Sequence, residues 1–148
     1  MDVAGRVVLI TGASSGVGAA LAEQLAGMGA RVFVNYSRSA DAAEAVVSRI
    51  TSAGGQALAV QADVSEEADC KRLVAATIEQ FGQLDVLVNN AGTTTFVPHD
   101  QLEALTEEVW LRTLRVNLIG AFMMSREAAP HIGAAGGGEI IMTSSIAS

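Results

Sequence analysis

Short runs of apolar residues alternate along the chain with segments in which apolar residues recur every three or four positions. The runs are typical of buried strands, and the spaced segments are typical of helices that cover them. Such an alternation favours right-handed β-α-β crossovers and a parallel sheet, an α/β fold. The expected strands are 7–10, 31–36, 57–61, 84–88 and 139–143.

Capping residues and glycines set the expected bounds of the helices. Gly54 and Gly55 stop the second helix, and Ser65 is expected to cap the third. Thr106 opens a long fourth helix, which is expected to end before Pro130. The expected helices are 19–25, 41–53, 66–81 and 106–129, with loops at 93–105 and 133–138.

The first strand leads into a glycine-rich turn, T-G-A-S-S-G-V-G at residues 11–18, and then into a helix. Backbone N–H groups and the positive end of a helix dipole meet at such a junction, where a phosphate can bind. We expect Gly12 to allow the tight turn, Gly16 to permit close approach of a pyrophosphate, and Gly18 to let the helix pack closely. A glycine hairpin is the alternative, but residues 19–25 repeat at helical spacing.

Size and charge limit the function. The 148 residues suffice for one domain, so we expect a single dinucleotide-binding domain over 1–148. A formal net charge of −7 argues against nucleic acid and anionic membranes as partners, so a phosphate site would be local. Residues 1–6 lack a basic region followed by a long apolar segment, and no later run is long enough to span a membrane. We therefore expect a cytoplasmic protein.

The sulfur and imidazole side chains do not indicate a redox or metal site. Cys70 is the single cysteine and lies in a charged helical segment, so it is interpreted as an ordinary helix residue. His99 and His131 lie in loop-like stretches without metal-ligand spacing. No metal is expected.

Further motifs follow the glycine turn in order: D-V at 63–64, N-N-A-G at 89–92, R-V-N-L at 115–118 and T-S-S-I-A at 143–147. The ordered set resembles the short-chain dehydrogenase/reductase family, in the subgroup similar to 3-oxoacyl-[acyl-carrier-protein] reductases. The resemblance covers the whole chain, as the N-terminal part of such a domain. It implies a Rossmann-type doubly wound parallel sheet, truncated after the fifth strand. It also implies an NADP-dependent oxidoreductase that transfers a hydride between NADPH and a carbonyl or alcohol, with a 3-oxoacyl thioester as one candidate substrate.

The resemblance assigns a nucleotide-binding role to two of these motifs. Asp63 would accept a hydrogen bond from the adenine amino group beside Val64, and Asn90 and Gly92 would place backbone beside the cofactor ribose. The structural alternatives are that Asp63 caps the next helix and that 89–92 is a strand-ending turn. The expected cofactor-binding residues are Gly12, Ser14, Ser15, Gly16, Val17, Gly18, Ser37, Arg38, Asp63, Val64, Asn90, Ala91 and Gly92.

Two catalytic residues follow from the resemblance. Asn117 would hold a water and a main-chain carbonyl in a proton relay, and Ser145 would donate a hydrogen bond to the substrate carbonyl oxygen. Asn117 shares a helix face with Trp110 and Leu114, which suggests a buried amide. A helix–helix contact through Asn117 and a strand-end serine are the alternatives.

The end of the second strand indicates which cofactor is preferred. It reads N-Y-S-R at 35–38, where an enzyme for NAD would place a carboxylate. Arg38 is therefore expected to bind the 2′-phosphate of NADP(H) in preference to NAD(H), with a solvated loop arginine as the alternative. The missing carboxylate also disfavours a methyltransferase with a similar glycine loop.

The family's reaction requires a tyrosine and, four residues later, a lysine that lowers the tyrosine pKa. The chain has one tyrosine, Tyr36, and one lysine, Lys71, which cannot form this pair. In relatives the pair would lie beyond the position of Ser148. We expect the chain to carry the cofactor half of an enzyme and to be inactive alone. A non-catalytic short dinucleotide-binding module is the alternative.

The fourth helix and the fifth strand both have apolar surface to cover. The fourth helix has too many apolar residues for all of them to face the sheet: Leu111, Leu118, Phe122 and Met123. In related reductases this helix packs against its counterpart in another subunit. A homo-oligomer, a dimer or tetramer when intact, is expected. The fifth strand is apolar on both faces, and nothing in the sequence follows to pair with its outer edge.

Overall fold

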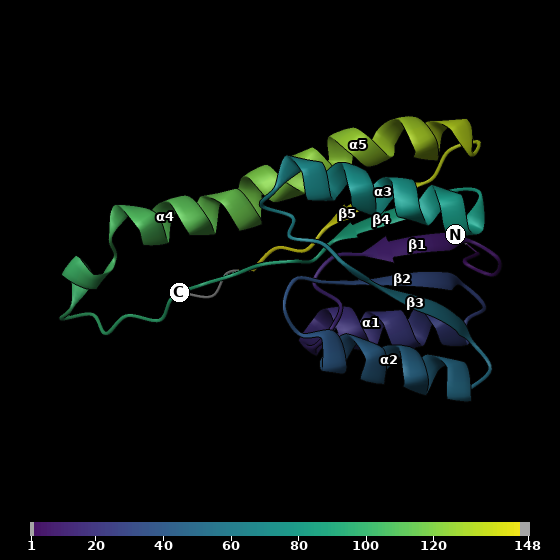
Figure 1. Ribbon diagram of the computed structural model, residues 1–148, viewed down its shortest axis with the longest axis horizontal. Helices are drawn as coiled ribbons and strands as arrows, with labels where there is room; N and C mark the ends of the chain where they lie inside the picture. Colours follow the sequence, from purple (N-terminus) through teal and green to yellow (C-terminus); the bar gives the residue numbers. More distant parts are fainter. Residues whose placement is uncertain (1, 146–148) are drawn as a thin grey trace.

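The computed structural model describes residues 2–145, which form a five-stranded parallel sheet with helices on both faces (Figure 1). The strand order is β3-β2-β1-β4-β5, so the chain winds outward from β1 and then returns to its other side. This doubly wound Rossmann-type arrangement confirms the expected fold. The strands are β1 (Val7–Ile10), β2 (Arg31–Tyr36), β3 (Gln56–Gln61), β4 (Val86–Asn89) and β5 (Glu139–Met142).

The strands at the centre of the sheet are buried on both faces. Alternate side chains point to opposite faces, so Val7 and Leu9 enter one core while Val8 and Ile10 enter the other. Full burial of each such side chain stabilises the fold by about 1.5–3 kcal/mol. The first core lies under α3 (Glu67–Phe81) and α5 (Ala121–Ala134), and the second under α1 (Gly16–Gly27) and α2 (Ala40–Ser52) (Figure 1).

A long helical stretch connects β4 to β5. It comprises α4 (Glu107–Leu114), the π-helical segment η2 (Arg115–Gly120) and α5, after a short 3-10 turn η1 (Leu102–Ala104) in the expected loop. Helix α4 extends beyond the sheet and has no buried residue (Figure 1). Gly120 lets the helix pass the loop after β3, because a Cβ there would lie 2.7 Å from the Val64 carbonyl oxygen.

The expected cap of α3 was wrong. The helix begins at Glu67 after the N-cap Glu66. Ser65 instead donates its hydroxyl to Asp63 Oδ1 at 2.7 Å. The hydroxyl is therefore used within the turn before the helix, and not on the helix itself.

The expected end of the long helix before Pro130 was also wrong. Helix α5 continues through Pro130 and His131 to Ala134. Pro130 is exposed, so the hydrogen bond that it cannot donate is lost on the solvent side. Ile132, two residues later, packs into the core and keeps the helix on the sheet. Among the described residues, no helix combines the length and apolar composition needed to cross a bilayer.

Candidate nucleotide-binding site

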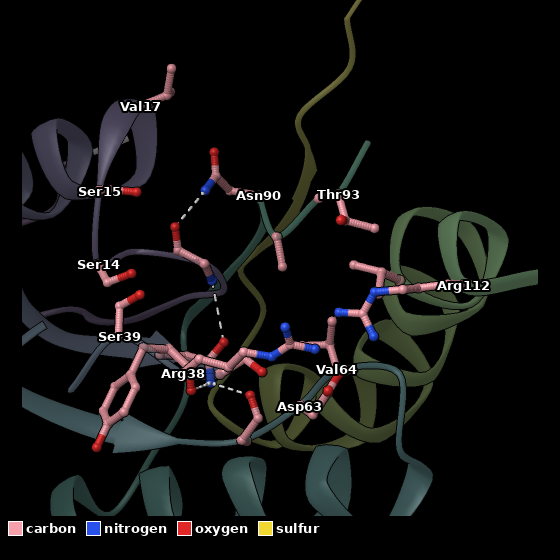
Figure 2. Close-up of a pocket in the computed structure, with 18 residues that line it drawn as sticks. Ser14, Ser15, Val17, Arg38, Ser39, Asp63, Val64, Asn90, Thr93 and Arg112 are labelled. Carbon is pink, nitrogen blue, oxygen red and sulfur yellow. Dashed lines mark hydrogen bonds between the residues drawn. The ribbon is translucent and has the colours of Figure 1, made fainter. Parts of the chain in front are cut away.

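A cavity of about 470 Å³ lies at the carboxyl edge of the sheet, where the segments after β1, β2, β3 and β4 meet (Figure 2). Open α/β sheets bind ligands at this edge, where the strand order reverses. The volume is within the range of small-molecule sites, about 300–1,000 Å³. The expected cofactor residues that line it are Gly12, Ser14, Ser15, Val17, Ser37, Arg38, Asp63, Val64, Asn90, Ala91 and Gly92.

The three glycines of the turn after β1 have different surroundings. Gly12 has a positive φ of 63°, and a Cβ there would lie 2.8 Å from Ala91 Cα. Gly16 also has a positive φ, 56°, but has open space around it at the start of α1. A Cβ on Gly18 would lie 2.6 Å from Asn90 Nδ2 and 2.7 Å from the Gly12 oxygen. The close packing at Gly18 is thus against the turns after β1 and β4. Gly16 and Gly18, both expected to bind the cofactor, do not line the cavity.

Asn35 connects the glycine turn to the loop after β3, a role that the sequence analysis missed. The side chain is 1% exposed. Its Oδ1 accepts a hydrogen bond from Gly12 N at 3.2 Å, and its Nδ2 donates to the carbonyl oxygens of Val60 and Ala62 at 3.2 and 3.1 Å. A single amide within an otherwise apolar strand was the available signal.

The turn after β4 is fastened to the glycine turn by reciprocal hydrogen bonds. Thr11 Oγ1 accepts from the backbone N–H groups of Asn90 and Ala91, each at 3.0 Å. Asn90 Nδ2 donates to the carbonyl oxygen of Thr11 at 3.0 Å and to that of Gly12 at 3.1 Å, and Figure 2 draws the bond to Gly12. The amide of Asn90 therefore holds the two turns together, and Asn90 also lines the cavity.

Asn117 lies in η2 and is exposed, so the buried amide expected from its helix face was wrong. That face has no core beneath it, since α4 extends past the sheet and Trp110 is 57% exposed. The amide nevertheless has both partners in one residue: Oδ1 accepts from Thr93 N at 2.8 Å, and Nδ2 donates to Thr93 O at 2.9 Å. Asn117 thus fixes the segment after the N-N-A-G turn.

Ser145 follows β5 at the carboxyl edge and is exposed. The remaining residues of its motif, Ile146 and Ala147, lie outside the described residues. The structure therefore positions Ser145 at the same edge of the sheet as the cavity, although it does not line the cavity.

Asp63 is held as a carboxylate at the cavity wall. Its Oδ1 accepts hydrogen bonds from Ser65 N at 3.0 Å and Ser65 Oγ at 2.7 Å. Burial raises its pKa, but these bonds and the guanidinium groups of Arg112 and Arg38 outweigh burial, so the pKa lies below the ordinary 3.8. At neutral pH Asp63 is a hydrogen-bond acceptor.

Two arginines face the cavity without an ion pair. Arg38 follows β2 and Arg112 comes from α4, and Figure 2 shows their side chains directed toward the space above Asp63 and Val64. Arg6, Arg49, Arg72 and Arg126 are paired with carboxylates, as Arg49 is with Glu23 at 2.7 Å, whereas Arg31 donates to backbone carbonyl oxygens. Within residues 2–145, neither Arg38 nor Arg112 forms such a pair. Arg112 was missed because the sequence does not show which side of α4 faces the cavity.

A glycine turn at the switch point of a doubly wound parallel sheet defines the class of α/β proteins that bind dinucleotides. A family model described as short chain dehydrogenase matches residues 6–148. The chain belongs to the short-chain dehydrogenase family, as its sequence motifs predicted.

Curated relatives and solved structures agree with this assignment. The chain is 49% identical over 142 residues to an uncharacterized oxidoreductase of Methylorubrum extorquens, covering 96% of this chain and 55% of that protein. It is 47% identical over 141 residues to a ketoacyl reductase assigned to the granaticin polyketide synthase of Streptomyces violaceoruber, covering 95% and 55%. A Burkholderia cenocepacia short chain dehydrogenase, solved in complex with NADP, has 38% identity and a TM-score of 0.88, covering 99% and 58%. The chain thus spans little more than half the length of these proteins.

Proposed function

We propose that the chain binds NADP(H) in the cavity and contributes the cofactor half of a carbonyl reductase. In the intact protein a hydride would move between NADPH and a carbonyl or alcohol, with a 3-oxoacyl thioester as the first substrate to test. The choice of NADP(H) rests mainly on Arg38, which faces the cavity and forms no ion pair within the described residues. Arg38 follows the end of β2, where the sequence has no carboxylate. The NADP complex of one relative and the ketoacyl reductase name of another support this proposal.

The residues around the cavity suit the parts of this cofactor. The open start of α1 at Gly16 would receive the pyrophosphate on backbone N–H groups. Asp63 would accept a hydrogen bond from the adenine amino group, and Asn90 and Gly92 would lie beside a ribose of the cofactor. Arg38 would bind the 2′-phosphate through a charge-assisted hydrogen bond.

Catalysis needs more than these 148 residues provide. Asn117, which donates a hydrogen bond to the Thr93 carbonyl oxygen, would orient a water molecule. Ser145 would orient the substrate carbonyl. Lys71 pairs with Glu67 on α3 at 2.8 Å, and Tyr36 ends β2, so neither supplies the tyrosine–lysine pair. Without a general acid the chain alone should lose about 10²–10⁴-fold in rate.

The cofactor preference is tested by titrating the chain with NADPH and NADH. Arg38→Ala should reduce the preference for NADPH, because the 2′-phosphate loses its cation. Arg115→Ala is the matched control, since Arg115 has the same charge but does not line the cavity. An unchanged ratio of the two affinities in Arg38→Ala would show that Arg38 does not bind the 2′-phosphate.

A non-catalytic binding module is the second candidate, favoured by the missing tyrosine–lysine pair. The reading frame downstream of Ser148 distinguishes the two candidates. A longer version that contains Tyr-x-x-x-Lys should oxidise NADPH with a 3-oxoacyl thioester or a simple ketone at a much higher rate than Met1–Ser148. Comparable rates would mean that the catalytic groups lie elsewhere.

A homo-oligomer of the intact protein belongs to the same proposal. Leu111, Leu118 and Phe122 are 51%, 63% and 61% exposed, whereas Met123 packs into the core. The exposed residues extend along α4, η2 and α5, which suits packing against a second copy. Light scattering of the intact protein at micromolar concentration should show a dimer or tetramer, and a monomer would contradict this. A cytoplasmic location of the intact protein is also proposed.

A further inference from the structure

We propose that Arg112 is a recognition residue for the adenine ring, and that its guanidinium forms the wall of the base site opposite Arg38. This inference rests on the proposed function, because it assigns a residue to one end of the same nucleotide. The carboxyl edge of the sheet supplies the other contacts, whereas Arg112 comes from α4, beyond the edge of the sheet.

The first observation is the position of Arg112. It lines the cavity although α4 has no buried residue, and Val116, one helical turn later, also lines it. Figure 2 shows the side chains of Arg38 and Arg112 approaching from opposite sides of the space above Asp63 and Val64. The two arginines therefore flank one site from two different elements.

The second observation is that Arg112 has no carboxylate or carbonyl partner within 2–145. It lies close enough to Asp63 that its charge helps to hold the pKa of that carboxyl below 3.8, ahead of the contribution of Arg38. Asp63 already accepts two hydrogen bonds from Ser65. The Arg112 guanidinium thus keeps its donors and its flat face for a ligand.

The surroundings favour a base over a phosphate at this place. A phosphate beside the Asp63 carboxylate would be repelled by its charge. Val64 and Val116 are buried apolar residues that form the floor, 6% and 8% exposed. A flat base can lie on this apolar floor with its amino group toward Asp63 and its π face toward a guanidinium. Adenine has these properties, so Arg112 contacts the base while Arg38 is left for the 2′-phosphate.

Two nucleotide ligands distinguish the contribution of the base to binding from that of the 2′-phosphate. 5′-AMP and 2′,5′-ADP differ only in that phosphate, so calorimetric titration of Met1–Ser148 with each reports the two contributions. The variants are Arg112→Gln, Arg112→Lys and the control Arg115→Gln, which removes one charge from a neighbouring helical position outside the cavity. Thermal unfolding followed by circular dichroism verifies that each variant is folded.

Arg112→Gln should weaken both nucleotides by the same factor, about two- to fivefold, as expected for an exposed cation–π contact. Arg112→Lys should recover only part of that loss, because it retains the charge but not the flat fork. Arg115→Gln should leave both affinities unchanged. Arg38→Ala should weaken 2′,5′-ADP more than 5′-AMP.

Two results would overturn the assignment of Arg112. One is an Arg112→Gln variant that binds both nucleotides as the wild type does; the other is a loss confined to 2′,5′-ADP, which would make Arg112 a phosphate ligand. Either result leaves the proposed NADP(H) site intact if Arg38→Ala still lowers the selectivity. A wild-type chain that binds neither nucleotide would instead refute the proposed function together with the role of Arg112.

Discussion

Replacing the glycines of the turn after β1 by alanine separates backbone strain from steric clash. An alanine at position 16 would have to adopt the positive φ of 56°, but its Cβ would have no neighbour within 4 Å. The substitution should therefore lower the free energy of unfolding only by the cost of a left-handed backbone, about 1–2 kcal/mol. At Gly12 the φ is 63° and the new Cβ would also lie 2.8 Å from Ala91 Cα. Overpacking adds about 1–3 kcal/mol, so Gly12→Ala should cost about 2–5 kcal/mol.

Gly54 provides the control outside the site. Its φ is 86° with open space around it, so Gly54→Ala should match Gly16→Ala in stability. Each variant loses the same freedom in the unfolded chain, so this contribution cancels in the comparison. Urea unfolding followed by far-UV circular dichroism gives the free energies of unfolding, provided that the m-value is unchanged.

The free energy of unfolding of Gly12→Ala should therefore be lower than that of Gly16→Ala by about 1 kcal/mol or more. Gly16→Ala should still weaken NADPH binding, because its methyl group occupies the open start of α1, whereas Gly54→Ala should not. If Gly12→Ala were no more destabilising than Gly16→Ala, the close approach of Gly12 to Ala91 would not contribute to the stability of the fold.

Two further substitutions test the polar groups that hold the sheet. Asp85→Asn should cost about 2–4 kcal/mol, because this buried carboxylate accepts from Val7 N at 2.7 Å and Arg6 Nη1 at 2.8 Å. Burial raises the Asp85 pKa, but its hydrogen bonds outweigh this and lower it below 3.8, so the stability is present above that pH and lost below it. The wild-type advantage should thus shrink in acid, and a constant difference in urea unfolding from pH 7 to pH 2.5 would contradict this. Asn35→Leu should cost about 1–3 kcal/mol and weaken NADPH binding, because the Gly12 N–H loses its partner; full stability with full affinity would contradict that role.

The sequence predicts the centre of the sheet well because β1, β4 and most of β2 are buried on both faces, whereas β5 at the edge is exposed. A strand between two helical layers has no polar face, so its apolar run is easily distinguished from the loops around it. The glycine turn is equally visible, since the positive φ at Gly12 and Gly16 restricts which residues can occupy these positions. Much of the cavity wall follows directly from these two features.

Properties that depend on packing between distant elements could not be predicted. Pro130 normally ends a helix, but the burial of Ile132 keeps α5 continuous. The π-helical segment at Asn117 leaves no pattern in the sequence, and the orientation of Arg112 depends on how α4 leaves the sheet. Asn35 was overlooked because its partners lie 23–27 residues away.

The proposed site is tested most directly by backbone amide NMR of Met1–Ser148 during titration with NADPH. Chemical-shift changes should cluster at the glycine turn 12–18 and at the loops 35–39, 62–65 and 90–93, and should extend to Arg112 on α4. The surface between α1 and α2, at Glu23 and Arg49, should not respond. Saturable changes confined to that surface, or no changes at millimolar NADPH, would contradict a dinucleotide site at the carboxyl edge of the sheet.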